Sequence, residues 1–437
     1  MSQIHPTLQQ YIAKEKARLN NDIELIASEN YPSQAILDIL GSCLSVKYAE
    51  GYPTSVSKLG RHYGGCEVID GVEEFAIEQG TKLFNVNYMN VQPMSGTHAN
   101  TCVYHAFCKP GAKTLSMSLN SGAHLTHGSK FTYSGRFYEN HSYDLINELI
   151  DYDVIKTRLF EVKPRLLITG YSAYSHKIDF KRIREFVDEY NKELYNELSA
   201  KCGEYEDPTK EFEDKKCILW CDMAHFAGFI AAHIWEDEYD PTKYCDVITS
   251  TTHKTLRGPR GGIIAWNNSA YSAKINQAVF PGNAGGPNEA LVAAKAQCFV
   301  EAQSEEYVTY MKQVAENMQG VLKGIAEVDT AGKIRIVSGG SSNHLALLDL
   351  KNTGLTGKEA EDLLLSRHVV TNKNMIEGDP SPSKSSGLRI GTAAATTRGL
   401  TYDQSIVLGR YIAKVLLNEE FESVATDIPK DFEKFYN

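Results

Sequence analysis

The chain has 437 residues, of which 42% are hydrophobic and 23% charged, so it contains enough apolar side chains for a large core and for two or three domains. Its net charge of -10 and its lack of a long basic run argue against a nucleic acid or an anionic membrane as partner. It has no run of about 18 apolar residues, so we expect no membrane-spanning helix. The nine cysteines include no Cys-x-x-Cys pair, which argues against a zinc site or a disulfide framework and favours the cytoplasm.

Residues 6–20 have apolar side chains near helical spacing, which predicts an amphipathic helix. The first 20 residues contain no apolar block, so we do not expect a secretory signal peptide. A helix set apart from the core sequence in this way packs either on a second subunit or on its own chain, and the sequence leaves both open.

The polar cluster Ser28–Tyr31 follows an apolar run and meets a proline, a pattern that by itself indicates a capped turn. The segment from Tyr48 to Cys66 combines Glu50 with tyrosines and glycines, a composition that allows a loop to approach a ligand closely. A helix is expected from Val68 to Phe84, because apolar residues recur there on one face.

Two further polar segments are candidates for ligand binding. Ser95-Gly96-Thr97 begins a helical pattern, and such a helix N-terminus binds anions, although Ser and Thr are also ordinary helix caps. The loop Asn120–Gly128 contains His124 and His127 without a third metal ligand at useful spacing. We therefore expect a histidine ring stacked on a cofactor and no metal.

Three apolar strands, each followed by a polar strand end, predict an α/β fold. They begin near residues 166, 218 and 246, and their alternation with helices favours a mostly parallel sheet with the site at the carboxyl ends of its strands. The second strand delivers Asp222 and the third delivers Lys254 in a turn rich in hydroxyls and glycines. A lysine there could hold an aldehyde cofactor as a Schiff base, and an aspartate could keep a pyridine nitrogen protonated. Alone, Lys254 would be interpreted as a surface lysine at a strand end.

The remaining segments define the domain prediction. Residues 192–216 are highly charged and indicate an exposed helix extension and loop without chemistry. A long helical stretch from Asn288 to about Glu327 leads to a second α/β segment. We expect its strands near 334–337 and 345–350, and its helices at 357–367 and 402–417, the last with a Thr401-x-x-Gln404 capping box. The predicted organisation is an N-terminal helical arm at 1–20, a large domain at 21–287 and a smaller C-terminal domain at 288–437.

Taken together, these segments resemble serine hydroxymethyltransferase, a family of fold-type I pyridoxal phosphate enzymes related to aspartate aminotransferase. The resemblance runs from about Glu24 to Leu416 in the same motif order. It rests on the segments 24–31, 48–53, 124–128, 222–225, 251–262 and 386–392. It implies an aspartate aminotransferase-like fold with a smaller C-terminal α/β domain. It also implies a homodimer or tetramer in which each active site is built from two chains.

The resemblance implies a set of residues that bind pyridoxal 5'-phosphate. Lys254 matches the lysine that holds the cofactor covalently, Asp222 the partner of the pyridine nitrogen, and His225 a residue near the ring hydroxyl. His124 matches the ring that stacks on the cofactor. The remaining cofactor positions are Ser95, Gly96, Thr97, Ser172, Thr251 and His253, together with Gly285 and Gly286, which match the side of the phosphate site supplied by the partner subunit.

The resemblance also implies binding sites for serine or glycine and for tetrahydrofolate. Arg389 matches the arginine that clamps the substrate carboxylate, in keeping with the two parallel bonds that a guanidinium forms to a carboxylate. Glu50 matches the acid/base at the serine hydroxyl and meets the folate. The other substrate positions are Ser28, Tyr48, Tyr63, Leu119, Leu125 and Asn374.

The chain departs from the family pattern mainly on the folate side. Met94 and His62 replace a histidine and a tyrosine, the loop 54–60 is longer than usual, and Asn288-Glu289-Ala290 replaces an expected Leu-Met-His. Cofactor and amino-acid residues are intact. The expected activity is therefore serine–glycine interconversion with tetrahydrofolate. The alternatives are a folate-independent β-hydroxy amino acid aldolase or transaldolase, a 2-methylserine hydroxymethyltransferase, or a non-catalytic protein with the same fold.

Overall fold

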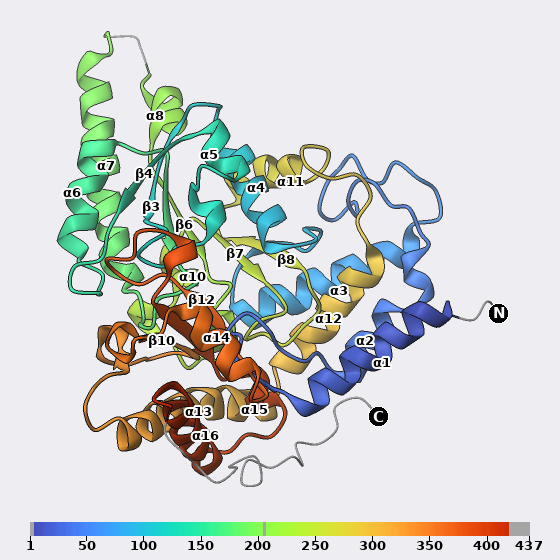
Figure 1. The fold of residues 1–437 in the computed structure, drawn as a ribbon. Coiled ribbons are helices and arrows are strands. Elements are labelled where there is room, and N and C mark those ends of the chain that lie inside the picture. The colour runs from blue at the N-terminus through green and yellow to red at the C-terminus, as the bar shows by residue number, and fades with distance from the viewer. Residues whose placement is uncertain (1–3, 204–206, 419–437) are drawn as a thin grey trace. The chain divides into compact units, whose positions relative to one another are not determined.

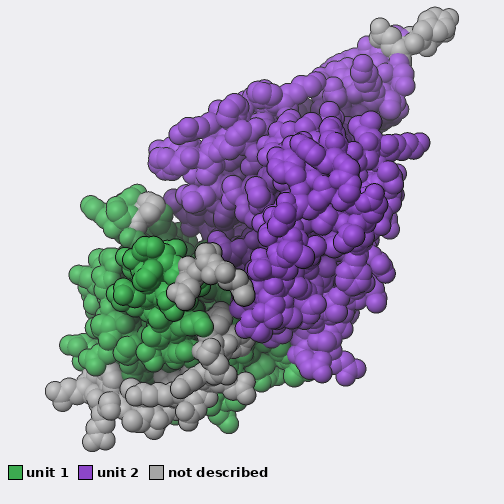
Figure 2. Space-filling model, turned by 90° about the vertical axis from the view of Figure 1, so that its right-hand side faces the viewer, with its two compact units in different colours: residues 1–31, 173–176, 309–437 green, residues 32–172, 177–308 purple. Residues whose placement is uncertain are grey.

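The computed structural model describes residues 4–203 and 207–418. Residues 1–3, 204–206 and 419–437 fall within the predicted arm, the charged insertion and the C-terminal domain, and lie outside the described residues. The chain forms two compact units, coloured separately in Figure 2. Unit 1 comprises residues 1–31, 173–176 and 309–437, and unit 2 comprises residues 32–172 and 177–308.

The centre of unit 2 is a seven-stranded sheet in the order β2-β8-β7-β6-β5-β3-β4. Its strands are β2 (Tyr88–Asn90), β3 (Lys113–Met117), β4 (Glu139–Tyr143), β5 (Leu166–Gly170), β6 (Ile218–Asp222), β7 (Val247–Thr251) and β8 (Gly262–Trp266). β8 pairs antiparallel with both of its neighbours, β2 and β7, and all other strand pairs of this sheet are parallel. All residues of β5, β6 and β7 are buried, as expected for parallel strands covered on both faces. The predicted α/β fold with a mostly parallel sheet is confirmed.

Helices surround this sheet (Figure 1). They are α2 (Gln34–Leu40), α3 (Glu67–Phe84), α4 (Gly96–Phe107), α5 (Tyr133–Phe137), α6 (Tyr152–Val162), α7 (Phe180–Lys201), α8 (Thr209–Lys215), α9 (Ala227–Ala231), α10 (Pro241–Tyr244), α11 (Ser272–Val279) and α12 (Glu289–Ala302). α4 packs on β7, β8 and α11, and buries Val103 in a core with Trp220 and Trp266. α12 packs along α3 and α2.

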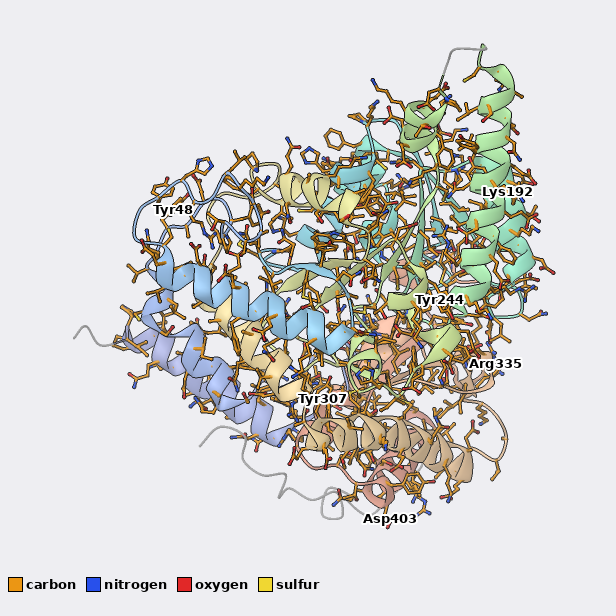
Figure 3. The ribbon with its side chains drawn as sticks, turned by 180° about the vertical axis from the view of Figure 1, so that it is seen from behind. Tyr48, Lys192, Tyr244, Tyr307, Arg335 and Asp403 are labelled. Atoms are coloured by element: carbon orange, nitrogen blue, oxygen red, sulfur yellow. The ribbon has the colours of Figure 1, made fainter. Side chains whose placement is uncertain are left out.

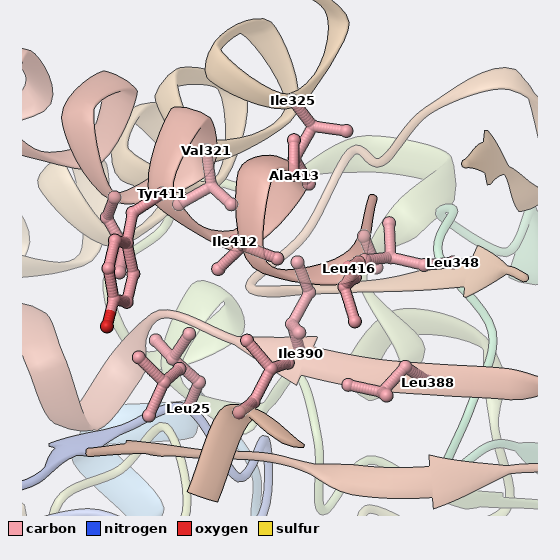
Figure 4. Packing of buried hydrophobic residues seen from close by; sticks show 14 of the residues in the cluster. Leu25, Val321, Ile325, Leu348, Leu388, Ile390, Tyr411, Ile412, Ala413 and Leu416 are labelled. Atoms are coloured by element: carbon pink, nitrogen blue, oxygen red, sulfur yellow. The ribbon is translucent and has the colours of Figure 1, made fainter. Parts of the chain in front are cut away.

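Unit 1 contains a four-stranded antiparallel sheet in the order β12-β13-β10-β9. These strands are β12 (Asn372–Asn374), β13 (Gly387–Gly391), β10 (Leu345–Asp349) and β9 (Arg335–Ile336), and β1 (Ile23–Glu24) pairs in parallel with β11 (Val369–Val370). The helices are α1 (Pro6–Asn21), α14 (Gly357–Leu365), α15 (Ala393–Thr397) and α16 (Tyr402–Leu416), while α13 (Glu305–Val328) crosses the division between the units. Figure 4 shows Ile412 and Leu416 of α16 packed with Leu388 and Ile390 of β13.

Most predicted elements are present, with two differences. The helices expected at 6–20, 68–84, 357–367 and 402–417 correspond to α1, α3, α14 and α16, and α16 has the Thr401–Gln404 capping box. The long helical stretch after Asn288 is two helices, α12 and α13, and the strand expected at 334–337 is only two residues long. The division into an arm and two domains stays a prediction. The two compact units divide the chain at other residues. No helix within residues 4–203 and 207–418 is long and apolar enough to cross a membrane.

Candidate active site

The predicted cofactor residues of unit 2 lie at the carboxyl ends of its parallel strands. Gly170 at the end of β5 pairs with Asp222 at the end of β6, and Asp222 pairs with Thr249 of β7. Because the strands are in register, the segments that follow them emerge at one edge of the sheet. Ser172 joins this edge, and its backbone N–H donates to the carbonyl of Gly122 (2.8 Å), which fixes the loop that carries His124.

Asp222 is a buried carboxylate with three hydrogen-bond donors around it. Oδ2 accepts from Nδ2 of Asn100 (2.8 Å) and Nε2 of His127 (3.1 Å), and Oδ1 accepts from the backbone N–H of Ala224 (3.1 Å). Burial raises the pKa of Asp222, but the hydrogen bond and charge of His127 and the charges of His124 and Lys254 outweigh it. The pKa therefore lies well below its usual range. Asp222 is ionised at neutral pH and is a suitable partner for a buried cation.

The two histidines of the loop have different roles. The backbone N–H of His124 donates to Nδ1 of His127 (3.4 Å), so we assign the proton of His127 to Nε2, which donates it to Asp222. Nδ1 of His124 accepts from the backbone N–H of Thr126 (3.2 Å). The fold brings the potential metal-ligand atoms of His124, His127 and Asp222 within 4.8 Å of one another. Asp222 is thus a third potential metal ligand, which the spacing of the loop residues did not reveal. Of the two histidines, His127 bonds to the Asp222 carboxylate, while Nδ1 of His124 bonds to Thr126.

The helix α4 forms the side predicted to bind phosphate. Ser95 is its N-cap and accepts from the backbone N–H of His98 (3.1 Å). A Cβ atom on Gly96 would lie 2.6 Å from Cγ2 of Thr251, so only glycine lets the helix start this close to the end of β7. Oγ1 of Thr251 is buried and makes no hydrogen bond within the described part of the chain. Thr97 follows in the first turn, whose free N–H groups favour an anion.

Lys254 lies in a turn closed by hydrogen bonds. The side chain of Thr252 donates to the carbonyl of Pro259 (2.6 Å), and the N–H of Gly258 donates to the carbonyl of Thr252 (2.7 Å). Lys254 itself is buried, with 7% of its surface exposed.

The neighbours of Lys254 are equally constrained. The hydroxyl of Thr255 donates to the carbonyl of His225 (3.2 Å), which ties the lysine turn to the strand end that carries Asp222. Burial and the charges of Lys254 and Arg260 lower the pKa of His253 to about 3, so its ring is neutral at neutral pH.

A second group of predicted residues gathers around the turn that carries Glu50. The Tyr48 hydroxyl donates to Oε1 of Glu50 (3.5 Å), and the rings of Tyr48 and Tyr63 are 5.2 Å apart. Cβ atoms added to Gly285 and Gly286 would lie 3.2 Å from Oε1 of Glu50 and 3.3 Å from the Tyr48 ring. Gly285 and Gly286, which are predicted to serve the partner subunit's site, therefore cluster with Tyr48, Glu50 and Tyr63 in a single chain. Figure 3 marks Tyr48 in its loop before α3. Two further predicted substrate residues, Leu119 and Leu125, are exposed and lie near His124 in the chain.

Three predicted substrate residues belong to unit 1. Arg389 lies at the centre of β13, and its Nε donates to Oδ1 of Asn372 (3.1 Å) on β12. Burial lowers the pKa of Arg389 to about 10, which still leaves the guanidinium charged at neutral pH. Asn374 lies on β12, where its side chain donates to the carbonyl of Met375 (2.6 Å), and Ser28 lies in the turn after β1.

Sequence reasoning missed two residues that hold Asp222. Asn100 lies 122 positions before Asp222, and His127 lies 95 positions before it, so no local pattern connects them. The available signal was the polar Asn100 one turn after the predicted helix start, although Thr97, His98 and Thr101 beside it in α4 are polar as well. Its Oδ1 accepts from the Thr249 hydroxyl (2.7 Å), which in turn accepts from Nε1 of Trp220 (2.9 Å). This chain of bonds orients the Asn100 amide toward the carboxylate.

Comparisons with known proteins place the chain in a family. A family model described as serine hydroxymethyltransferase matches residues 1–204 and 198–412. A serine hydroxymethyltransferase of Lactobacillus gasseri is 45% identical over 97% of this chain and 95% of its own length. The serine hydroxymethyltransferase of Lactobacillus acidophilus is 43% identical over 98% of this chain and 96% of its own length. That of Dichelobacter nodosus is 44% identical over 96% of this chain and 93% of its own length. The chain belongs to the serine hydroxymethyltransferase family.

Proposed function

We propose that the protein is a pyridoxal phosphate-dependent enzyme that interconverts serine and glycine and transfers the one-carbon unit to tetrahydrofolate. The observation that carries the proposal is the ionised, buried carboxylate of Asp222 at the same sheet edge as the buried Lys254. Burying an ionised carboxylate costs free energy unless hydrogen bonds or a cationic partner compensate it, and Asp222 has three hydrogen-bond donors around it.

The residues present fit pyridoxal phosphate. Lys254 would hold the aldehyde carbon, and Asp222 would face the pyridine nitrogen. The N-terminus of α4, from Ser95 to Thr97, would bind the phosphate, and the buried Thr251 hydroxyl beside Gly96 supplies a spare polar group there. His124 would stack on the ring, and Ser172 and His225 would bind its polar edge.

When bound, pyridoxal phosphate supplies an electron-withdrawing ring that takes up the electron pair released at the α-carbon of the amino acid. The protein's task is to keep the ring nitrogen protonated, and the low pKa of Asp222 allows its carboxylate to stabilise that proton. The ring of His253 adds no competing positive charge at this edge, since its pKa is about 3, and His127 donates Nε2–H to Asp222.

The substrate residues would act on serine itself. Arg389 would bind the carboxylate through paired hydrogen bonds. Glu50 would accept or return the proton of the serine hydroxyl, and Tyr48, which donates to Glu50, would orient it. Tyr63, Ser28 and Asn374 would complete the amino-acid site, and Leu119 and Leu125 would contact the folate.

We further propose a homodimer or tetramer in the cytoplasm. The support is that Tyr48, Glu50, Tyr63, Gly285 and Gly286 form one cluster of exposed or half-buried residues, as needed if one chain contributes them together to a partner's site. The cysteines of the described residues form no disulfide, in keeping with a reducing compartment.

The decisive experiment is serine turnover with and without tetrahydrofolate, compared with folate-free cleavage of allo-threonine. Folate-dependent formation of glycine from serine is the expected result. Cleavage of allo-threonine together with no response of serine turnover to folate would instead favour a β-hydroxy amino acid aldolase. Failure of the purified protein to bind pyridoxal phosphate would contradict the whole proposal.

A further inference from the structure

A buried cluster of charged side chains supports the turn that carries Glu50. Arg61 is its centre, with 4% of its side chain exposed. Its Nε donates to Asp70 (2.8 Å), and its Nη2 donates to Glu73 (2.8 Å). Its Nη1 donates to the carbonyls of Ala49 (2.8 Å) and Gly51 (2.9 Å), the two residues that flank Glu50. The position of the Glu50 backbone therefore depends on where this guanidinium lies.

Lys295 completes the positive charge of the cluster. Its side chain is fully buried, and Nζ donates to the carbonyls of Val91 (2.7 Å), Pro93 (2.7 Å) and Gly262 (3.0 Å). Burial lowers the pKa of Lys295 to about 7, and the charges of Glu73 and Glu289 oppose that shift. Three acceptors match the three N–H groups of an ammonium, whereas a neutral amine has only two, so the geometry favours the charged form.

Glu289 is the one acidic group in this cluster without a hydrogen bond. It is the first residue of α12, and its side chain is 0% exposed. Neither carboxyl oxygen makes a hydrogen bond within the described residues, and Nη2 of Arg61 stays 4.0 Å from Oε1. The charges of Arg61 and Lys295 already balance those of Asp70 and Glu73. An ionised Glu289 would thus be an uncompensated buried charge.

The surroundings of Glu289 raise its pKa to about 8. Burial is the largest cause of the rise, and the negative charges of Glu73 on α3 and of Asp70 add to it. The positive charges of Arg61 and Lys295 lower the pKa. These are the charged groups that face Glu289 from α3, from the Arg61 turn and from α12 itself. The carboxyl is consequently protonated and neutral at neutral pH.

We infer that Glu289 is a positioning residue that controls the Glu50 turn through Arg61, leaving the turn undisturbed when protonated and loosening it when ionised. Four of the five N–H groups of Arg61 are used by Asp70, Glu73 and the two carbonyls, and the fifth, on Nη2, is the nearest to Glu289. A carboxylate at Glu289 attracts that group, and closing 4.0 Å to a charged hydrogen bond of about 2.8 Å moves Arg61 by roughly 1 Å. The bonds to Ala49 and Gly51 lengthen as a result.

The functional part of this inference rests on the proposed role of Glu50 in serine turnover. It predicts an alkaline decline of kcat that begins near the pKa of Glu289, while the Michaelis constant for serine changes little. Glu289→Gln keeps the size of the side chain but cannot ionise, so its kcat should decline at higher pH than that of the unmodified chain. At about pH 9 the variant should retain several times more of its neutral-pH kcat. Glu67→Gln is the matched control, because Glu67 is also the first residue of a helix, α3, but is exposed and lies outside the cluster.

Two measurements test the inference independently of serine turnover. The first is infrared difference spectroscopy, in which the band of a protonated carboxyl should disappear on alkaline titration and be missing from Glu289→Gln. The second is hydrogen exchange at the N–H groups of Tyr52 and His62, which close the turn by donating to the carbonyls of Gly60 (3.4 Å) and Glu50 (2.9 Å). Compared at the same alkaline pH, these N–H groups should exchange several-fold faster in the unmodified chain than in Glu289→Gln.

The outcomes separate the two proposals. If serine is not converted at any pH, the proposed function fails, and the infrared band and the exchange rates still decide the role of Glu289. If the band is missing at neutral pH, or if exchange and the kcat profiles are the same in the unmodified chain and Glu289→Gln, the inference is wrong. If Glu289→Gln is folded and binds the cofactor but has lost turnover at neutral pH, Glu289 has a different role and the inference is also wrong.

Discussion

Replacing Asp222 with asparagine tests the feature on which the proposed chemistry depends. Three buried N–H groups point at this carboxylate, from Asn100, His127 and Ala224. Asparagine keeps one oxygen and puts an NH2 group in place of the other. If the amide faces Asn100 and His127, two donors lose their acceptor, and if it faces Ala224, one does. His127 cannot adapt by becoming an acceptor at Nε2, because its Nδ1 already accepts from the His124 backbone.

The magnitude follows from these contacts. At least one buried donor is left without an acceptor, which costs about 1–3 kcal/mol of folding free energy. The loss of the negative charge removes electrostatic stabilisation at the reacting ring, and kcat should fall by about 10²–10³ or more. Unfolding in urea measures the first effect, and serine turnover of the cofactor-loaded protein measures the second.

Asp246→Asn is the matched control for this change. Asp246 is a half-buried carboxylate of unit 2, and it accepts from the N–H of Leu219 (2.8 Å) and from Arg184 (3.0 Å) at the opposite end of the strands. It should lose stability without a comparable loss of kcat. If Asp222→Asn retains kcat within a few-fold of the unmodified chain, or if both variants lose kcat equally, the assignment of Asp222 is wrong.

Lys254→Ala should abolish serine turnover and the visible absorbance of bound pyridoxal phosphate, and an unchanged absorbance band would remove Lys254 from the site. Arg389→Ala should raise the Michaelis constants for serine and glycine by about 10² or more while cofactor absorbance persists, because a carboxylate would lose its charged partner; near-normal saturation by serine would contradict this. Glu50→Gln should reduce folate-dependent serine cleavage by about 10²–10⁴ but spare folate-free aldol cleavage, and an equal loss of both would show that Glu50 is not specific to the folate reaction. Glu289→Gln should also remove a pH dependence of stability. Because burial raises the pKa of Glu289 from 4.5 to about 8, the unmodified chain loses stability as pH rises between these values, so urea midpoints of the two proteins should be similar at low pH and favour the variant by pH 8.

The strand ends and helix starts could be predicted from the sequence because their signals are local. An apolar run that stops at Asp222 defines β6, and a β-branched run followed by hydroxyl residues up to Thr251 defines β7. Ser95 is both a predicted and an observed helix cap. The break between α12 and α13 was also local but was overlooked: the Ser304 hydroxyl accepts from the N–H of Tyr307 (3.2 Å) and caps the second helix.

Contacts that depend on strand order could not be predicted in the same way. The approach of Asn100 and His127 to Asp222 requires that β3, β5, β6 and β7 pair in a particular order and register. The burial of Glu289 requires that the start of α12 pack against α3, which places it beside Arg61 and Glu73. On its own, a glutamate at the first position of a helix indicates only a favourable interaction with the helix dipole.

The helix α4 also fixes the distance between the two ends of the proposed cofactor site. Its first residue, Gly96, lies at the proposed phosphate end, and Asn100, one turn later, is bonded to the carboxylate at the proposed pyridine end. Four residues of α-helix rise by about 6 Å, and this spacing is rigid because the backbone hydrogen bonds of the turn fix it. A vitamer whose phosphate and ring nitrogen are further apart or closer together could satisfy one end only. On the proposed function, the protein would select its cofactor by distance as well as by charge. One residue inserted between Gly96 and Asn100 would turn Asn100 about 100° away from Asp222, even if every ligand-binding side chain were retained.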